Sequence, residues 1–189
     1  MNKGLMWLII AALPAIAVAG VHKHVKHSHW TSKYDVHFKK YTKHYFGPHF
    51  DWHWFKAQAI AESALNPEAV SPVGARGIMQ IMPDTFGDIK RSNPMVTHIA
   101  DPKWNIAAGI YYDRQLYREW KKRKKVRVQD RLYFTFASYN AGLGNVLKAY
   151  KRATARYGEV EDWERVEPHT PKETRLYVKR INSLMQTSN

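Results

Sequence analysis

Apolar residues at helical spacing, interrupted by proline and glycine, fill the chain from Tyr34 onward and restrict it to a mostly α fold. The first such segment runs from Tyr34 to Phe46 and ends before Gly47-Pro48. No long stretch alternates as a strand would, and we find no internal repeat. The chain of 189 residues is long enough for one domain with a buried core. We therefore predict a single, mostly α domain over residues 34–189, with little or no sheet.

Caps and helix breakers place the remaining helices. Asp51 is expected to cap a helix that runs to Asn66, the residue before Pro67. Asp101-Pro102 is expected to begin a long helix that ends near Lys122, because Asp caps well and Pro suits the first helical position. The other expected helices are a short one from Pro83, one containing Leu132, Phe136 and Tyr139 that stops at Gly142, one over residues 145–156, and one from Pro171.

The N-terminus has the pattern of an export segment. A positive end, Met1 to Lys3, precedes an apolar run from Leu5 to Ala19, and small residues at 17–19 suit a cleavage site. The run is shorter than the roughly 20 residues of a membrane span. We predict a signal peptide over residues 1–19, with an uncleaved inner-membrane anchor over residues 5–21 as the alternative. Either one predicts an exported protein, periplasmic or associated with the cell envelope.

Cysteine is absent, and the formal net charge is +14. The first fact excludes disulfides, thiolate catalysis and the lipid-modified cysteine of a lipoprotein. The second predicts contact with an anionic wall polymer or membrane surface. The basic run over residues 121–127 could also bind nucleic acid, but aromatics are not interleaved with it and no recognition motif accompanies it, so no nucleic-acid partner is expected.

Residues 20–33 are basic and rich in histidine. Histidines at this spacing could hold a metal ion. No acidic partner lies nearby in the sequence, so we interpret the segment as a solvated linker and predict no metal site.

Glu62 is the leading candidate for chemistry. Trp52, Phe55, Ala59 and Glu62 are spaced three, four and three residues apart, so they share one helical face, and that face is otherwise apolar. A carboxyl group on an inward face needs either a partner or a raised pKa. A raised pKa is what a general acid requires near neutral pH. The structural alternative is an ion pair with Arg76 or Lys90.

Four motifs follow one another along the sequence: Glu62-Ser63 with the loop to Ser71, residues 77–83 (GIMQIMP), residues 137–142 (ASYNAG) and residues 173–178 (ETRLYV). Together they resemble the SLT-type lytic transglycosylases of bacterial cell-wall metabolism, within the lysozyme-like superfamily. The resemblance covers roughly residues 50–185 and departs from the family's usual Ala-Tyr-Asn motif only in Ser138. The resemblance implies a lysozyme-like fold.

The resemblance also implies a role for each matched position. Glu62 corresponds to the single catalytic acid/base, and Tyr139 to a residue close to it. The positions that would bind substrate or frame the groove are Ser71, Gln80, Met82, Asn140, Glu173 and Tyr177, the last two near the far wall. Five of these positions have a structural alternative: a turn at Ser71, backbone capping by Gln80, core packing by Met82 and Tyr139, and an ion pair of Glu173 with Arg175 or Arg180.

The implied reaction cuts the β-1,4 bond between N-acetylmuramic acid and N-acetylglucosamine in peptidoglycan, leaving 1,6-anhydro ends without any cofactor. A hydrolysing muramidase would need a second carboxylate, for which the candidates are Glu68, Asp84, Asp88 and Asp101. A non-catalytic wall-binding or assembly protein of the same fold is the other alternative. We expect a monomer.

Overall fold

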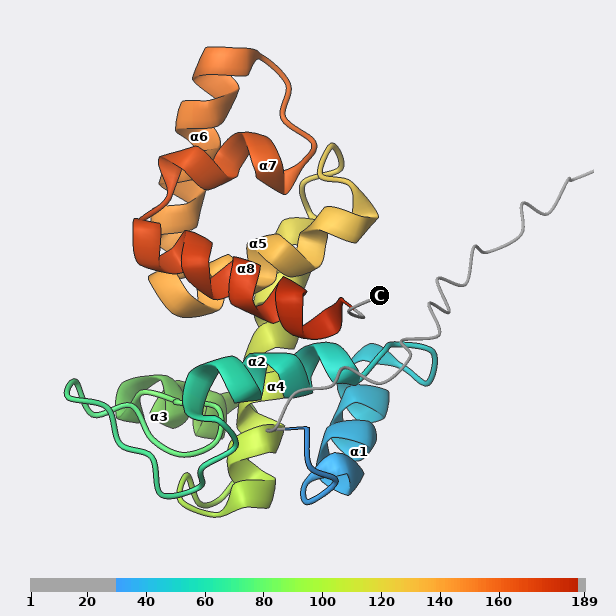
Figure 1. Ribbon diagram of the computed structural model, residues 1–189, viewed down its shortest axis with the longest axis vertical. Helices are drawn as coiled ribbons and strands as arrows, with labels where there is room; N and C mark the ends of the chain where they lie inside the picture. The colour runs from blue at the N-terminus through green and yellow to red at the C-terminus, as the bar shows by residue number, and fades with distance from the viewer. Residues whose placement is uncertain (1–29, 187–189) are drawn as a thin grey trace, which may run out of the picture.

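The computed structural model describes residues 30–186, and Figure 1 shows their arrangement. The predictions for the export segment at 1–19 and for the histidines up to His29 fall outside these described residues. Within residues 30–186, no helix combines the length and the apolar character that crossing a membrane requires.

The mostly α prediction is confirmed: the described part of the chain contains helices and two isolated β-bridges, and no sheet. The longer helices are α1 (Asp35–Phe46), α2 (His53–Ser63), α3 (Pro83–Ser92), α4 (Pro102–Lys121), α5 (Arg131–Ala141), α6 (Leu143–Tyr157) and α8 (Lys172–Met185). The short ones are η1 (Val128–Asp130), α7 (Trp163–Val166) and η2 (Glu167–His169).

Helix α4 connects the two parts of the molecule. In Figure 1, α1, α2 and α3 lie around its lower half, and α5 to α8 lie in the upper part. Helix α4 packs against α1 and α5, and α2 packs against α8 where the two parts meet. The core between them is strongly aromatic; Phe55 of α2 contacts Phe136 of α5 edge to face, and Trp120 of α4 stacks on Phe134. Because α2 packs against α8, the C-terminal end of α2 lies close to α8.

The caps behave largely as predicted. The Asp101 carboxylate accepts hydrogen bonds from the Lys103 and Trp104 backbone N–H groups and begins α4. Gly142 ends α5 with a positive φ of 83°. Asp51 accepts from the His53 backbone N–H at the start of α2, although Trp52 is the formal cap residue.

The predicted end of α2 was wrong by three residues. The helix stops at Ser63 rather than at Asn66, because Ala64 and Leu65 both adopt left-handed conformations, with φ of 54° and 63°. The expected helix over 145–156 is slightly longer, Leu143–Tyr157. The early stop of α2 leaves Glu62 in the final turn, next to the loop that follows.

Candidate active site

Glu62 lies at the C-terminal end of α2 with the apolar face of that helix behind it. Phe55 and Ala59 of the predicted face are fully buried, and Trp52 packs against the core from a half-buried position. The Glu62 side chain is half-buried, so it keeps some access to solvent. Its Oε1 accepts a hydrogen bond from the Tyr177 hydroxyl of α8 at 2.5 Å. The carboxyl group is therefore held from one side and open on another.

The pKa of the Glu62 carboxyl is raised from 4.5 to about 7, and burial is the main cause of the increase. The Tyr177 hydrogen bond and the positive charge of Arg180 act in the opposite direction and lower the pKa. Near neutral pH, both the protonated and the ionised forms are populated. Such a group can donate a proton in one step and accept one in the next. The alternative ion pairs with Arg76 or Lys90 do not form among the described residues.

The loop over residues 64–82 follows Glu62 and folds back on itself. Ser71 shapes its tip: the Ser71 Oγ accepts from the Ala75 N–H at 2.9 Å, and the Ser71 N–H donates to the Ala75 carbonyl at 2.9 Å. Arg76 forms antiparallel bridges with Val70 and with Ile81. Gln80, at a positive φ of 45°, donates from Nε2 to the carbonyls of Ala69 and Gly77 at 3.1 and 2.9 Å. Ser71 and Gln80 thus hold the loop's own backbone.

Side chains from three helices anchor this loop next to Glu62. The Ser63 hydroxyl of α2 donates to the Ile78 carbonyl at 2.8 Å, and the Tyr139 hydroxyl of α5 donates to the Met79 carbonyl at 2.8 Å. Asn105 of α4 accepts from the Met79 N–H at 2.7 Å and donates to the Arg76 carbonyl at 3.0 Å. The loop is fixed relative to the helix that carries Glu62.

Tyr139 and Tyr177 both lie in the electrostatic neighbourhood of Glu62. Burial raises the pKa of each phenol well above its ordinary value, and the charge of Glu62 raises it further. Both hydroxyls therefore stay protonated and act as hydrogen-bond donors. Tyr139 also packs against Tyr112, with ring centroids 5.3 Å apart. The resemblance implies a position near the far wall of the groove for Tyr177, and in the structure its hydroxyl contacts the Glu62 carboxyl directly.

The other predicted site residues are Asn140, Met82 and Glu173. Asn140 accepts a hydrogen bond from the Thr174 hydroxyl at 2.9 Å and so links α5 to α8. Met82 is 39% exposed at the start of α3, and Glu173 is exposed in the first turn of α8. Across residues 30–186, no hydrogen bond or ion pair joins Ser71, Met82 or Glu173 to Glu62.

Sequence reasoning missed three buried polar residues around the site: Gln58, Asn105 and Asp113. Asn105 is the main anchor of the loop, and Asp113 is the buried carboxyl whose pKa the Glu62 charge raises. A polar residue at an inward-facing helical position is the sequence signal that could have identified them.

The four candidates for a second carboxylate are exposed; Asp88 pairs with Arg91, and Asp101 caps α4.

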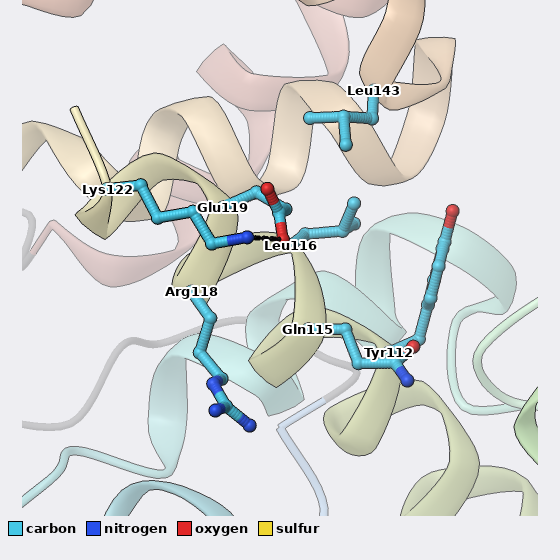
Figure 2. Close-up of a pocket in the computed structure, with 7 residues that line it drawn as sticks. All are labelled: Tyr112, Gln115, Leu116, Arg118, Glu119, Lys122 and Leu143. Atoms are coloured by element: carbon cyan, nitrogen blue, oxygen red, sulfur yellow. Dashed lines mark hydrogen bonds and ion pairs between the residues drawn. The ribbon is translucent and has the colours of Figure 1, made fainter. Parts of the chain in front are cut away.

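A surface pocket is lined in part by Tyr112, the residue that packs against Tyr139. Figure 2 shows its residues, which come from the C-terminal half of α4 and the start of α6, with a volume of about 450 Å³. Tyr112 lies at one end, and the ion pair between Lys122 and Glu119 (2.5 Å) lies along α4. Because Tyr112 contacts Tyr139, the pocket adjoins the residues that hold the loop. Over the described residues, no three histidine or acidic side chains group as a metal site would require.

Comparison with known proteins places the chain in a family. A family model described as "Transglycosylase SLT domain" matches residues 41–161. A membrane-bound lytic murein transglycosylase F of Histophilus somni (strain 2336) is 34% identical over 121 residues, which is 64% of this chain and 24% of that protein. The 70-kDa soluble lytic transglycosylase Slt70 of Escherichia coli matches with a TM-score of 0.67 and 31% identity, over 82% of this chain and 24% of its own. A complex of the 70-kDa soluble lytic transglycosylase with bulgecin A gives a TM-score of 0.66, also with 31% identity, over 82% of this chain and 24% of its own.

The chain thus spans about a quarter of the length of these relatives. The solved structures confirm the predicted lysozyme-like, mostly α fold. The family match covers residues 41–161, more than half of the 189-residue chain. On its sequence and its fold, the chain belongs to the SLT-type lytic transglycosylase family.

Proposed function

We propose that the chain cleaves the β-1,4 bond between N-acetylmuramic acid and N-acetylglucosamine in peptidoglycan and leaves 1,6-anhydromuramic ends. The observation that carries the proposal is the Glu62 carboxyl, with its pKa raised to about 7 and its Oε1 bound by Tyr177. The names of the relatives support the reaction class, since they are lytic murein transglycosylases.

In the first step, protonated Glu62 gives its proton to the glycosidic oxygen, and the bond between that oxygen and C1 of the muramic residue breaks. Glu62 becomes a carboxylate, which the Tyr177 hydroxyl stabilises by a charge-assisted hydrogen bond. In the second step, the carboxylate removes the proton from the 6-hydroxyl, whose oxygen attacks C1 and closes the anhydro ring. Glu62 ends as it began, and no water is consumed. The intramolecular attack benefits from high effective molarity.

The loop and the second tyrosine serve substrate placement in this proposal. Gln80, Ser71 and Tyr139 fix the loop backbone beside Glu62, so they would position the glycan through the loop. Met82, being exposed next to that loop, would contact the sugar directly. Asn140 would keep α5 and α8 in register, and Glu173 would lie at the far edge of the groove.

Hydrolysis, as in a muramidase, is the alternative that needs a second carboxylate at the bond. The candidates from the sequence are exposed and lack a link to Glu62 within the part of the chain that the structure describes. A non-catalytic wall-binding protein would gain nothing from a carboxyl group kept at a pKa of about 7. Transglycosylation is therefore the reaction that the site supports best.

We further propose a location in the cell envelope, with export directed by residues 1–19 or anchoring by residues 5–21. The relatives named membrane-bound support an envelope location. A surface depression on α4 is lined by four basic side chains, Arg114, Arg118, Lys121 and Lys122. It would contact an anionic wall polymer or lipid headgroup, and this contact should weaken with added salt.

Mass spectrometry of the fragments released from purified peptidoglycan tests the reaction. Anhydro ends are expected, whereas reducing ends would indicate hydrolysis. Glu62→Gln should fold normally by circular dichroism and lose nearly all activity, and Glu68→Gln, which alters an exposed carboxyl of the loop that follows α2, should keep it. Wild-type release of fragments by Glu62→Gln would remove Glu62 from the mechanism.

A further inference from the structure

A buried amide and a buried carboxyl face each other behind Glu62. Gln58 of α2 and Asp113 of α4 are both 0% exposed, and the Gln58 Nε2 donates to the Asp113 Oδ1 at 3.3 Å. Gln58 lies one helical turn before Glu62 on the same helix. The two residues therefore join α4 to the helix that carries the proposed acid/base.

The two remaining polar side-chain atoms of this pair have no hydrogen-bond partner within the described residues. Gln58 Oε1 and Asp113 Oδ2 are both buried, and neither has a hydrogen bond to any group within residues 30–186. If Asp113 were ionised, both atoms would be acceptors facing no donor, which is costly in a dry interior. A single proton on Asp113 Oδ2 makes that atom a donor, and Gln58 Oε1 can accept the hydrogen bond from it.

We propose that Asp113 is held as a neutral carboxylic acid, paired with the Gln58 amide by two hydrogen bonds in a closed ring. Nε2 donates to Oδ1, and the protonated Oδ2 donates to Oε1. The pair acts as a positioning device for α2 that adds no charge near Glu62. Its effect on catalysis rests on the proposed function of Glu62, but its protonation state does not.

The surroundings of Asp113 agree with a neutral acid. Burial raises the pKa of Asp113 well above its ordinary value; the Gln58 hydrogen bond lowers it, and the charge of Glu62 raises it. The other titratable groups that interact with Asp113 are the phenols of Tyr112, Tyr139 and Tyr177, all protonated. The cation of this region, Arg180, acts on Glu62. Asp113 is fully buried and only the Gln58 hydrogen bond lowers its pKa, whereas Glu62 is half-buried and both the Tyr177 hydrogen bond and Arg180 lower its pKa, so Glu62 loses its proton first.

This order of ionisation matters for the proposed reaction. Glu62 must become a carboxylate and then recover its proton. A charged Asp113 would repel that carboxylate and work against its formation. A neutral Asp113 leaves Glu62 as the carboxyl of this cluster that changes charge near neutral pH. Asp113 is thus assigned as a positioning residue rather than a catalytic one, since it is fully buried.

Asp113→Asn tests the protonation state without any activity measurement. The Asn amide can form the same two hydrogen bonds with Gln58 but cannot ionise. In wild type, an acid with a raised pKa contributes stability that is complete below the pKa of the unfolded chain, about 3.9, and is lost as pH rises. The folding equilibrium constant of Asp113→Asn relative to wild type should therefore rise at least tenfold between pH 5 and pH 7, measured by urea unfolding. Asp88→Asn, at an exposed carboxylate, is the matched control and should show no such rise. A flat ratio for Asp113→Asn would overturn the proposal.

A titration of wild type keeps the idea testable if the variant does not fold. The carboxyl ¹³C resonance of Asp113 should stay at its protonated position from pH 4 to pH 7, and ionisation near pH 4 would refute the neutral acid. On activity, Asp113→Asn should keep the wild-type pH profile of peptidoglycan cleavage, and a downward shift of the Glu62 limb would show that wild-type Asp113 is charged. An inactive wild type would contradict the proposed function but would leave the urea-unfolding test and the ¹³C titration valid.

Discussion

The Tyr177 hydroxyl is the group through which the Glu62 carboxylate can be perturbed most cleanly. Tyr177 is 9% exposed, so Tyr177→Phe keeps the ring packing and removes the 2.5 Å hydrogen bond to Glu62 Oε1. A hydrogen bond to a charged group contributes about 1.5–3 kcal/mol. One pH unit of pKa corresponds to about 1.4 kcal/mol. Because this bond favours the ionised form, its loss should raise the Glu62 pKa from about 7 by about one to two pH units.

The same loss should slow the reaction. The carboxylate formed after the first proton transfer would lose its donor, and cleavage at pH 7 should fall by about ten- to a hundredfold. The Glu62 pKa can be read from its carboxyl ¹³C resonance, assigned by comparison with Glu62→Gln. The activity limb that follows Glu62 ionisation should move to higher pH by the same amount.

Tyr133→Phe is the matched control, because its hydroxyl bonds Asn182 at 3.2 Å and is not among the groups that act on the Glu62 pKa. It should leave both the Glu62 titration and the pH profile unchanged. If the Glu62 pKa in Tyr177→Phe stayed near 7 or fell, the hydrogen bond would not be what stabilises the carboxylate, and the reasoning would fail.

Three further changes test other parts of the structure. Glu62→Gln should have a higher unfolding free energy than wild type by up to about 3 kcal/mol at pH 8, and the same unfolding free energy at pH 4. The reason is that the folded-state pKa of Glu62, about 7, lies above the 4.5 of the free group, so wild type loses stability as pH rises between these values. A pH-independent difference in urea unfolding would contradict this. Gly109→Ala would bring a Cβ within 2.7 Å of the Met79 side chain and should destabilise the protein by about 1–3 kcal/mol, seen as a lower Tm. Asp35→Ala leaves the Lys56 ammonium, on a side chain 2% exposed, without its carboxylate and should cost about 3 kcal/mol, whereas Asp35→Asn keeps an acceptor and should cost less; equal losses would show that charge pairing is unimportant there.

The local features of the site could be predicted from the sequence because they depend on neighbours along the chain. The inward face that carries Glu62 follows from residue spacing alone, and Phe55 and Ala59 are indeed fully buried. The Asp101 cap and the Gly142 stop are likewise local. In these cases the physical cause lies within a few residues of the effect.

The contacts between distant segments could not be predicted in this way. Tyr177 meets Glu62 across 115 positions, and no periodicity encodes which helix packs on which. The resemblance to the family predicts Tyr177 as a site residue, but it does not predict the hydrogen bond between Tyr177 and the Glu62 carboxyl. Helix α2 stops early because two residues other than glycine take left-handed conformations, a choice that tertiary packing imposes against local preference.

The anchoring of the loop by Ser63, Asn105 and Tyr139 has a consequence for the thermodynamics of the proposed glycan binding. Because this loop is already fixed to three helices, it has little conformational freedom left to lose when a sugar chain binds to it. Most of the ordering entropy on association would then fall on the glycan itself. Longer strands, which lose more freedom on binding, would need their extra contacts outside this loop to bind more tightly than short ones.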